Sequence, residues 1–252
     1  MANKPFHYTA LTKEKDLDVL INEIGDARVV MLGEASHGTS EYYTWRTAIS
    51  RRLIQEKGFN FIAVEGDWPE CYVVNRMVKG YQTTTKIADV LQVYRRWPTW
   101  MWANWEVAAL VEWLREYNNQ RNSNEKAGFY GLDVYSLWES LDQIVRYLEQ
   151  TDGQAAEAAR NAISCFEPFN RDPQVYAQAT AFVPTDCEEE VIEMLQKVQQ
   201  QRVFTDDPEE EFNTKQNALV AANAEKYYRE MIKGSGNSWN CLLYTSPSPR
   251  DS

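Results

Sequence analysis

The chain has 252 residues, of which 44% are hydrophobic, and a formal net charge of −11 at pH 7. This length fits one large domain or two small ones, and the acidic balance argues against a nucleic-acid partner, because phosphate binding needs clustered lysine and arginine. No apolar run reaches the ~18 residues that cross a bilayer, and the N-terminus lacks the apolar core of a signal peptide, so we expect a cytoplasmic chain without a membrane partner.

Three short apolar runs are predicted as strands, at residues 28–32, 60–64 and 128–132. The stretches between them have helical periodicity and are long enough for crossovers, which favours parallel pairing. Past Thr151 the pattern is helix after helix, and the acidic runs 188–190 and 209–211 are typical of first helical turns. The predicted fold class is therefore α/β, with a mostly parallel sheet, flanking helices and a long helical segment in the second half.

An acidic residue follows each predicted strand: Glu34 after the first, Glu65 after the second and Asp133 after the third. The ends of parallel strands share one edge of a sheet, so these carboxylates are expected to converge. Like charges in a shared site repel, a cost that folding alone does not explain, so this convergence indicates chemistry. The alternative for each is helix capping or solvation, a role that Asp67 fits well before Trp68-Pro69.

The segment from Gly33 to Thr39 (Gly-Glu-Ala-Ser-His-Gly-Thr) carries His37, one of only two histidines in the chain. It lies between the first predicted strand and a predicted helix, where open α/β sheets bind ligands. The other histidine, His7, sits in a polar N-terminal stretch and is expected at the surface. Glu34 and His37 are therefore the first candidates for a catalytic loop.

Arg46 is predicted to reach the crevice at the sheet edge where these carboxylates and His37 are expected to converge. On a helix that begins near Thr39, an apolar stripe is formed by Tyr42, Trp45, Ile49 and Leu53, and Arg46 borders it. Seven residues at about 1.5 Å each place Arg46 roughly 10 Å from the helix start, and helical side chains lean toward that end. The alternative is a surface arginine that pairs with Glu41 or Glu56.

The predicted helical region 89–118 is rich in tryptophan and is interrupted by Pro98. Large aromatic side chains normally fill cores. The alternative is an aromatic wall over the crevice, and on that interpretation Trp97, Trp100 and Asp133 are the candidate substrate-binding residues.

The four cysteines are scattered without a Cys-x-x-Cys pair, which suggests neither a zinc site nor a disulfide framework. We expect free thiols at Cys71, Cys165, Cys187 and Cys241, no metal and no cofactor.

Four ordered blocks of the sequence resemble the erythromycin esterase family: Gly33–Thr39, Glu41–Arg46, Gly58–Glu70 and Gly128–Asp133. Trp113–Asn118 and Ala224–Arg229 also resemble family segments, and the resemblance runs over about residues 10–240. The resemblance implies an ester hydrolase. More specifically, it implies a macrolide lactone as the substrate and a role in the response to antibiotic. It places the general base that activates water at His37 and its polar partners at Glu34, Arg46 and Glu65.

This mechanism needs no nucleophilic side chain. Ser36 lies beside His37 but the chain lacks a Gly-x-Ser-x-Gly elbow, so a covalent scheme is not expected. Two alternatives of other classes stay open: a metal-dependent hydrolase with Glu34, His37 and Glu65 as ligands, and a noncatalytic protein that binds an apolar small molecule.

The resemblance also implies a continuation past Trp239, with further strands and a later histidine motif. Residues 1–240 are therefore expected to be the N-terminal portion of an incomplete hydrolase domain that is inactive alone. The segment 241–252 resembles a translated transposase-end sequencing adaptor and is expected to be non-native. The alternative is a natural disordered tail rich in serine and proline.

Overall fold

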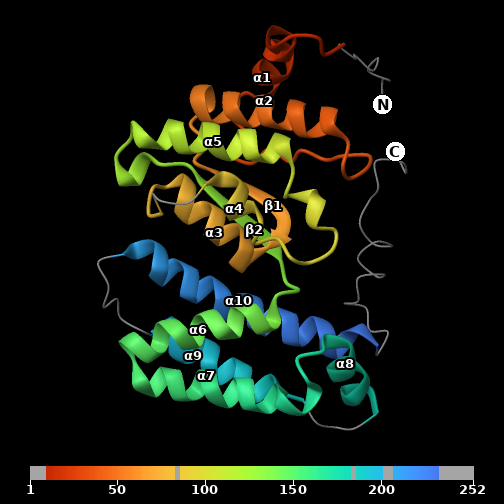
Figure 1. Ribbon diagram of the computed structural model, residues 1–252, viewed down its shortest axis with the longest axis vertical. Coiled ribbons are helices and arrows are strands. Elements are labelled where there is room, and N and C mark those ends of the chain that lie inside the picture. Colours follow the sequence, from red (N-terminus) through yellow and green to blue (C-terminus); the bar gives the residue numbers. More distant parts are fainter. Residues whose placement is uncertain (1–9, 83–85, 183–185, 201–206, 233–252) are drawn as a thin grey trace. The chain divides into compact units, whose positions relative to one another are not determined.

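The computed structural model describes residues 10–82, 86–182, 186–200 and 207–232. It is mostly helical, with one small parallel sheet in which β1 (Phe61–Asp67) pairs with β2 (Gly128–Asp133) (Figure 1). The α/β class with a long helical second half is therefore confirmed. Within the described residues, none of the helices has the length and hydropathy needed to traverse a bilayer. His7 and the segment 241–252 lie outside the described residues.

The chain forms two compact units. Unit 1 comprises Met1–Val64 and Val73–Tyr130, and unit 2 comprises Glu65–Tyr72 and Gly131–Ser252. Both strands and α3 (Trp68–Val78) contribute residues to each unit. The other described helices of unit 1 are η1 (Glu14–Leu17), α1 (Asp18–Ile24), α2 (Ser40–Lys57), α4 (Ile87–Leu91), η2 (Thr99–Met101), α5 (Trp105–Asn119) and η3 (Ser123–Glu125).

The predicted first strand, 28–32, is not a strand in the structure. It has no regular secondary structure, and Val29 is 76% and Met31 is 91% exposed. Val30 and Leu32 turn the other way and pack on the core between α1 and α2. This alternation is the pattern of a segment buried on one face only, and among the described residues no strand pairs with it. The apolar run was thus wrongly interpreted as a strand buried on both faces.

Helix α2 buries a slightly different face from the one predicted. Ile49 and Leu53 are buried and Trp45 is partly buried, as expected, but Tyr42 is 37% exposed and Tyr43 is only 4% exposed. The buried face is turned toward Tyr43 because α2 packs against α5 as well as α1 (Figure 1). This difference of one residue matters for the site described below.

A buried amide fixes the start of β2. Asn118, fully buried on α5, donates to the carbonyls of Val78 and Ala127 at 2.9 and 2.8 Å and accepts from the Ala127 N–H at 2.8 Å. Saturating a buried amide in this way avoids the cost of unpaired polar groups. Asn118 therefore ties the end of α3, the end of α5 and the start of β2 into one frame.

Unit 2 is a stack of helices in which α10 packs on α6, α8 and α9, while α7 packs on α6 and α9 (Figure 1). The acidic runs open helices as predicted, with Glu188 as the first residue of α9 and residues 209–211 in the first turn of α10. Its described helices are α6 (Leu137–Thr151), α7 (Gly153–Phe166), η4 (Glu167–Phe169), α8 (Pro173–Phe182), α9 (Glu188–Gln200) and α10 (Pro208–Met231).

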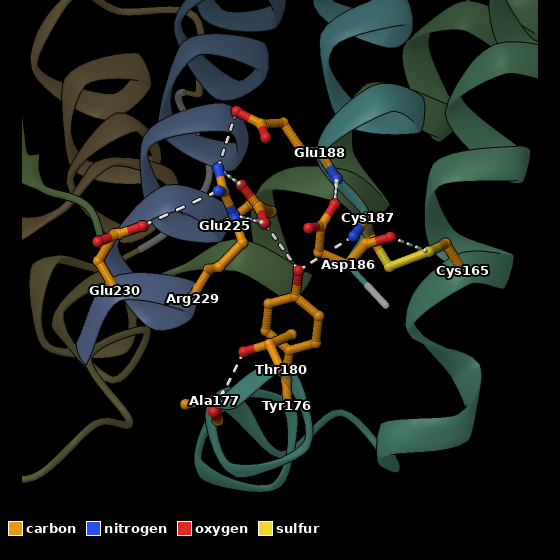
Figure 2. Close-up of polar contacts among 10 residues, drawn as sticks. All are labelled: Cys165, Tyr176, Ala177, Thr180, Asp186, Cys187, Glu188, Glu225, Arg229 and Glu230. Atoms are coloured by element: carbon orange, nitrogen blue, oxygen red, sulfur yellow. Dashed lines mark hydrogen bonds and ion pairs between the residues drawn. A yellow bond between two sulfur atoms is a disulfide. The ribbon is translucent and has the colours of Figure 1, made fainter. Parts of the chain in front are cut away.

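The prediction of free thiols was wrong for one pair. Cys165, at the end of α7, forms a disulfide with Cys187, just before α9 (Figure 2). The two residues are 22 positions apart and share no motif, so only the packing of α7 beside α9 brings them together. Cys71 is a buried thiol, and Cys241 lies outside the described residues.

Candidate functional site

Glu34 and His37 meet in the loop that leads from residues 28–32 to α2. The Nδ1 atom of His37 lies 2.6 Å from Oε1 of Glu34. Because an ionised carboxylate can only accept, Nδ1 carries the proton, and in the neutral imidazole Nε2 is then an acceptor. The Glu34 side chain is 10% exposed, whereas the His37 side chain is 46% exposed. The loop thus holds an imidazole by its inner nitrogen and leaves the ring accessible.

Arg46, in the second turn of α2, completes this cluster. Its Nη2 lies 3.0 Å from Oε2 of Glu34, and its side chain is 22% exposed. Arg46 thus pairs with Glu34, and Glu56, one of the two surface partners considered, pairs instead with Arg52 at 2.6 Å. Glu34 therefore stands between two groups that carry or can carry positive charge, which compensates the cost of holding a carboxylate with little exposure to water.

Two aromatic residues that the sequence reasoning missed surround Arg46. The centre of its guanidinium lies 4.8 Å from the ring centroid of Tyr43 and 6.0 Å from that of Trp102. Burial raises the pKa of the Tyr43 hydroxyl above its ordinary value, and the negative charge of Glu34 adds to the rise. The available signal was the spacing of Tyr43 and Arg46, three residues apart on one helix and hence on one face.

The His37 loop is joined to the tryptophan-rich segment. Gly38 has a φ of +77°, and a Cβ atom there would lie 2.7 Å from Cζ3 of Trp100, so both the backbone and the space favour glycine. The Ser40 hydroxyl donates to Glu106 at the start of α5, and this bond lowers the pKa of the Glu106 carboxyl. The hydroxyl of Ser36 lies 2.9 Å from that of Thr39.

The tryptophans of this segment do not all fill the core. Trp97 is 83% exposed and Trp100 is 45% exposed, so core filling was the wrong interpretation for both. The helix predicted for 89–118 is in fact broken well before Pro98, since α4 ends at Leu91 and α5 begins at Trp105. Trp100 nonetheless lies against Gly38, next to His37.

Glu65 and Asp133 were predicted to follow their strands, but both lie within them, because β1 continues to Asp67 and β2 to Asp133. Glu65 is exposed and Asp133 is partly buried. Both residues belong to unit 2, whereas the cluster of Glu34, His37 and Arg46 lies in unit 1. Their participation in the same site stays a prediction.

Within the part of the chain that the structure describes, no group of three or more His, Cys, Asp or Glu side chains is arranged to hold a metal ion.

Comparison with known proteins gives the family. The family model described as erythromycin esterase matches residues 54–247, which is most of the chain. The chain belongs to the erythromycin esterase family. The match begins after Arg46, so Glu65 and Asp133 lie inside it, while Glu34, His37 and Arg46 lie before it.

Two curated relatives support this membership. The chain is 34% identical to erythromycin esterase type II of Escherichia coli over 119 residues, which are 47% of the chain and 26% of the relative. It is 23% identical to the candidate hydrolase YbfO of Bacillus subtilis over 163 residues, 64% of the chain and 34% of that protein. The chain thus spans about a quarter to a third of these curated relatives.

Solved structures share the fold. A succinoglycan biosynthesis protein superposes with a TM-score of 0.69 at 20% identity, and a Bacillus cereus protein with a TM-score of 0.62 at 22% identity. Each comparison covers 86% of this chain and 52% of the other.

Proposed function

We propose that the protein is an ester hydrolase in which His37 activates a water molecule. The observation that supports this most directly is the pairing of an accessible imidazole, through Nδ1, with the largely buried carboxylate of Glu34 at 2.6 Å. Such pairing fixes the tautomer in which Nε2 can accept a proton, and it stabilises the imidazolium that results. Membership of the erythromycin esterase family supports a hydrolase, and we infer an ester as its substrate class.

The proposed reaction forms no covalent bond between the enzyme and the substrate. Nε2 of His37 takes a proton from water while the water oxygen bonds to the ester carbonyl carbon. The tetrahedral intermediate then expels the alkoxide, which receives the proton back from the imidazolium. Arg46 keeps guanidinium N–H groups beyond the one that faces Glu34, and we assign them to the oxyanion that develops on the carbonyl oxygen. Glu65 is assigned a supporting polar role.

The proposed substrate is a small-molecule ester with a large apolar part, such as a macrolide lactone. Trp97 and Trp100 offer exposed rings, and Trp100 lies against the His37 loop at Gly38. Aromatic side chains of this kind commonly line the apolar part of a ligand site. Asp133 is kept as a further candidate for contact with the substrate. On this proposal the enzyme acts in the cytoplasm on a macrolide that has entered the cell.

The decisive experiment compares the two histidines in a full-length protein that contains this sequence. His37→Ala is expected to lower hydrolysis of p-nitrophenyl acetate and of erythromycin by about two to four orders of magnitude, the usual contribution of a general base. His7→Ala, which removes the chain's other histidine, is the matched control and is expected to retain turnover.

Near-normal turnover of His37→Ala would remove this histidine from the mechanism. A chelator arm separates the alternative, because loss of activity in EDTA and its recovery with added Zn²⁺ would favour metal-dependent hydrolysis. Saturable binding of erythromycin without any turnover would instead favour a noncatalytic binding protein.

A further inference from the structure

The guanidinium of Arg46 makes three contacts, one with a carboxylate and two with aromatic rings. Its guanidinium faces Oε2 of Glu34 at 3.0 Å and lies over the rings of Tyr43 and Trp102, with centroid distances of 4.8 and 6.0 Å. A guanidinium over an aromatic face is attracted by the ring quadrupole, and the attraction grows as water is excluded. With 22% of its side chain exposed, Arg46 is partly shielded from water.

Tyr43 is itself anchored firmly. It is 4% exposed, and its hydroxyl donates to the backbone carbonyl of Met101 at 2.7 Å. Its ring meets that of Trp102 edge-to-face, with centroids 6.2 Å apart. Tyr43 thus supplies one ring beside Arg46. Through its bond to Met101 it also holds the segment that carries Trp102, the second ring.

Glu34 depends on this arrangement. Its Oε2 is buried and makes no hydrogen bond with any described residue, so the ion pair with Arg46 is its electrostatic compensation. If the guanidinium moved away, the carboxylate would be left with His37 alone, and the balance of charge around the imidazole would change. The position of Arg46 therefore affects both the charge compensation of Glu34 and the electrostatic environment of His37.

We propose that Tyr43 and Trp102 are positioning residues that hold Arg46 against Glu34. Neither residue needs to touch substrate. They act by restricting the guanidinium to the place where it compensates Glu34 and presents its remaining N–H groups to the oxyanion. The catalytic consequence rests on the proposed function, whereas the contact itself does not.

A double-mutant cycle in the 252-residue chain tests the contact. The variants are Tyr43→Leu, Arg46→Met and the pair, with urea unfolding followed by tryptophan fluorescence. This signal reports mainly on unit 1, which contains six of the nine tryptophans: Trp45, Trp97, Trp100, Trp102, Trp105 and Trp113. We expect a coupling of about five- to thirtyfold in the unfolding equilibrium constant.

Two further variants keep this cycle interpretable. Tyr43→Phe loses the bond to Met101 but retains the ring, so we expect its interaction with Arg46 to persist. If Tyr43→Leu does not fold, Trp102→Leu replaces it in the cycle, with a smaller coupling expected from its longer distance. Losses that simply add in both cycles would overturn the proposal.

Turnover in a full-length protein that contains this sequence tests the consequence. Tyr43→Leu is expected to lower kcat for p-nitrophenyl acetate about tenfold with KM within about twofold, and to have no further effect in the Arg46→Met background. Tyr43→Phe is expected to restore most of kcat. A residue with a merely structural role would lower activity equally in both backgrounds.

The matched control is a second cation–π pair, in which Arg121 lies 3.4 Å from the ring centroid of Tyr117 on α5. Tyr117→Leu and Arg121→Met are expected to be coupled in stability and to leave kcat unchanged. Coupling at Tyr43 with no change in kcat would overturn the positioning role. If His37→Ala also left hydrolysis intact, the proposed function would fail while the contact between Tyr43 and Arg46 stood.

Discussion

Each compact unit holds a carboxylate between an arginine and a ring that carries a proton. In unit 1, Glu34 lies 2.6 Å from His37 and 3.0 Å from Arg46. In unit 2, Glu225 accepts from the Tyr176 hydroxyl at 2.7 Å and from Nε of Arg229 at 2.8 Å (Figure 2). The residue types are nearly the same, so the two clusters isolate what makes such a group suited to chemistry.

The difference lies in the access of water to the ring. The His37 side chain is 46% exposed, whereas Tyr176 is fully buried and its carboxylate partner is 3% exposed. The polar partners of this cluster are protein groups: the Cys187 N–H donates to the Tyr176 hydroxyl at 3.1 Å, and Glu188 pairs with Arg229 at 2.8 Å. Burial raises the pKa of Tyr176 above its ordinary value. The cluster of unit 2 therefore stabilises a packed core, and that of unit 1 can meet a ligand.

The same substitution in the two clusters should separate these roles most strongly. Glu34→Gln removes the charge that stabilises the imidazolium of His37, so turnover in a full-length protein that contains this sequence is expected to fall by about a hundredfold to a thousandfold. Glu225→Gln leaves Arg229 with less compensation in a buried setting and is expected to lower the free energy of unfolding by about 2–3 kcal/mol.

Initial ester rates and urea unfolding curves, measured for both variants, check this pair of expectations. Glu225→Gln is expected to retain turnover when it is folded. The comparison breaks if Glu34→Gln changes only the stability, or if Glu225→Gln lowers kcat in a protein whose unfolding midpoint is unchanged.

Much of the local geometry could be predicted from the sequence because it is set within one loop and the first turns of one helix. Glu34, His37 and Arg46 lie within 13 residues, and helical rise limits how far Arg46 can be from the loop. Helix starts were equally local, as residues 209–211 show at the first turn of α10. Their roles in catalysis stay predictions.

The rest depended on packing between distant segments. Whether the run 28–32 becomes a strand depends on a partner strand, and whether Cys165 meets Cys187 depends on how α7 packs on α9. The exchange of Tyr42 for Tyr43 on the buried face has the same origin, because two helices rather than one cover α2. Periodicity fixes which residues share a face, but not where the neighbours lie.

The disulfide gives the next largest expected effect and belongs to unit 2 alone. The paired change Cys165→Ser with Cys187→Ser opens a loop whose ends are 22 residues apart, which is expected to lower the free energy of unfolding by about 3 kcal/mol. Urea unfolding followed by far-UV circular dichroism, with and without dithiothreitol, measures the loss. The reductant should have no effect on the double variant.

Peptide mapping under non-reducing conditions supplies the independent check on this bond. We expect the peptides that contain Cys165 and Cys187 to run as one linked species. Alkylation of Cys165 in the native, unreduced chain would show instead that the sequence-based expectation of free thiols was right. It would also remove one of the constraints that distinguish the core of unit 2 from the loop of unit 1.

The smallest expected effect is the loss of stability at alkaline pH that the Tyr135 hydroxyl in unit 2 causes. Burial raises the pKa of Tyr135 to about 12, with smaller contributions from nearby Tyr227 and Asp133. An unfolded tyrosine titrates near 10, so the folded state keeps its proton longer, and the stability gained is full below pH ~10 and is lost as the pH rises through 12. Tyr135→Phe cannot ionise and should reduce the fall of the urea unfolding midpoint with pH, measured from pH 9 to 12.

Tyr42→Phe, at a site 37% exposed on α2, is the control and should leave this pH dependence unchanged. The same pH dependence for Tyr135→Phe and the parent chain would show that this hydroxyl is hydrated in the folded state. It would also weaken the contrast between the buried core of unit 2 and the solvent-accessible site in unit 1.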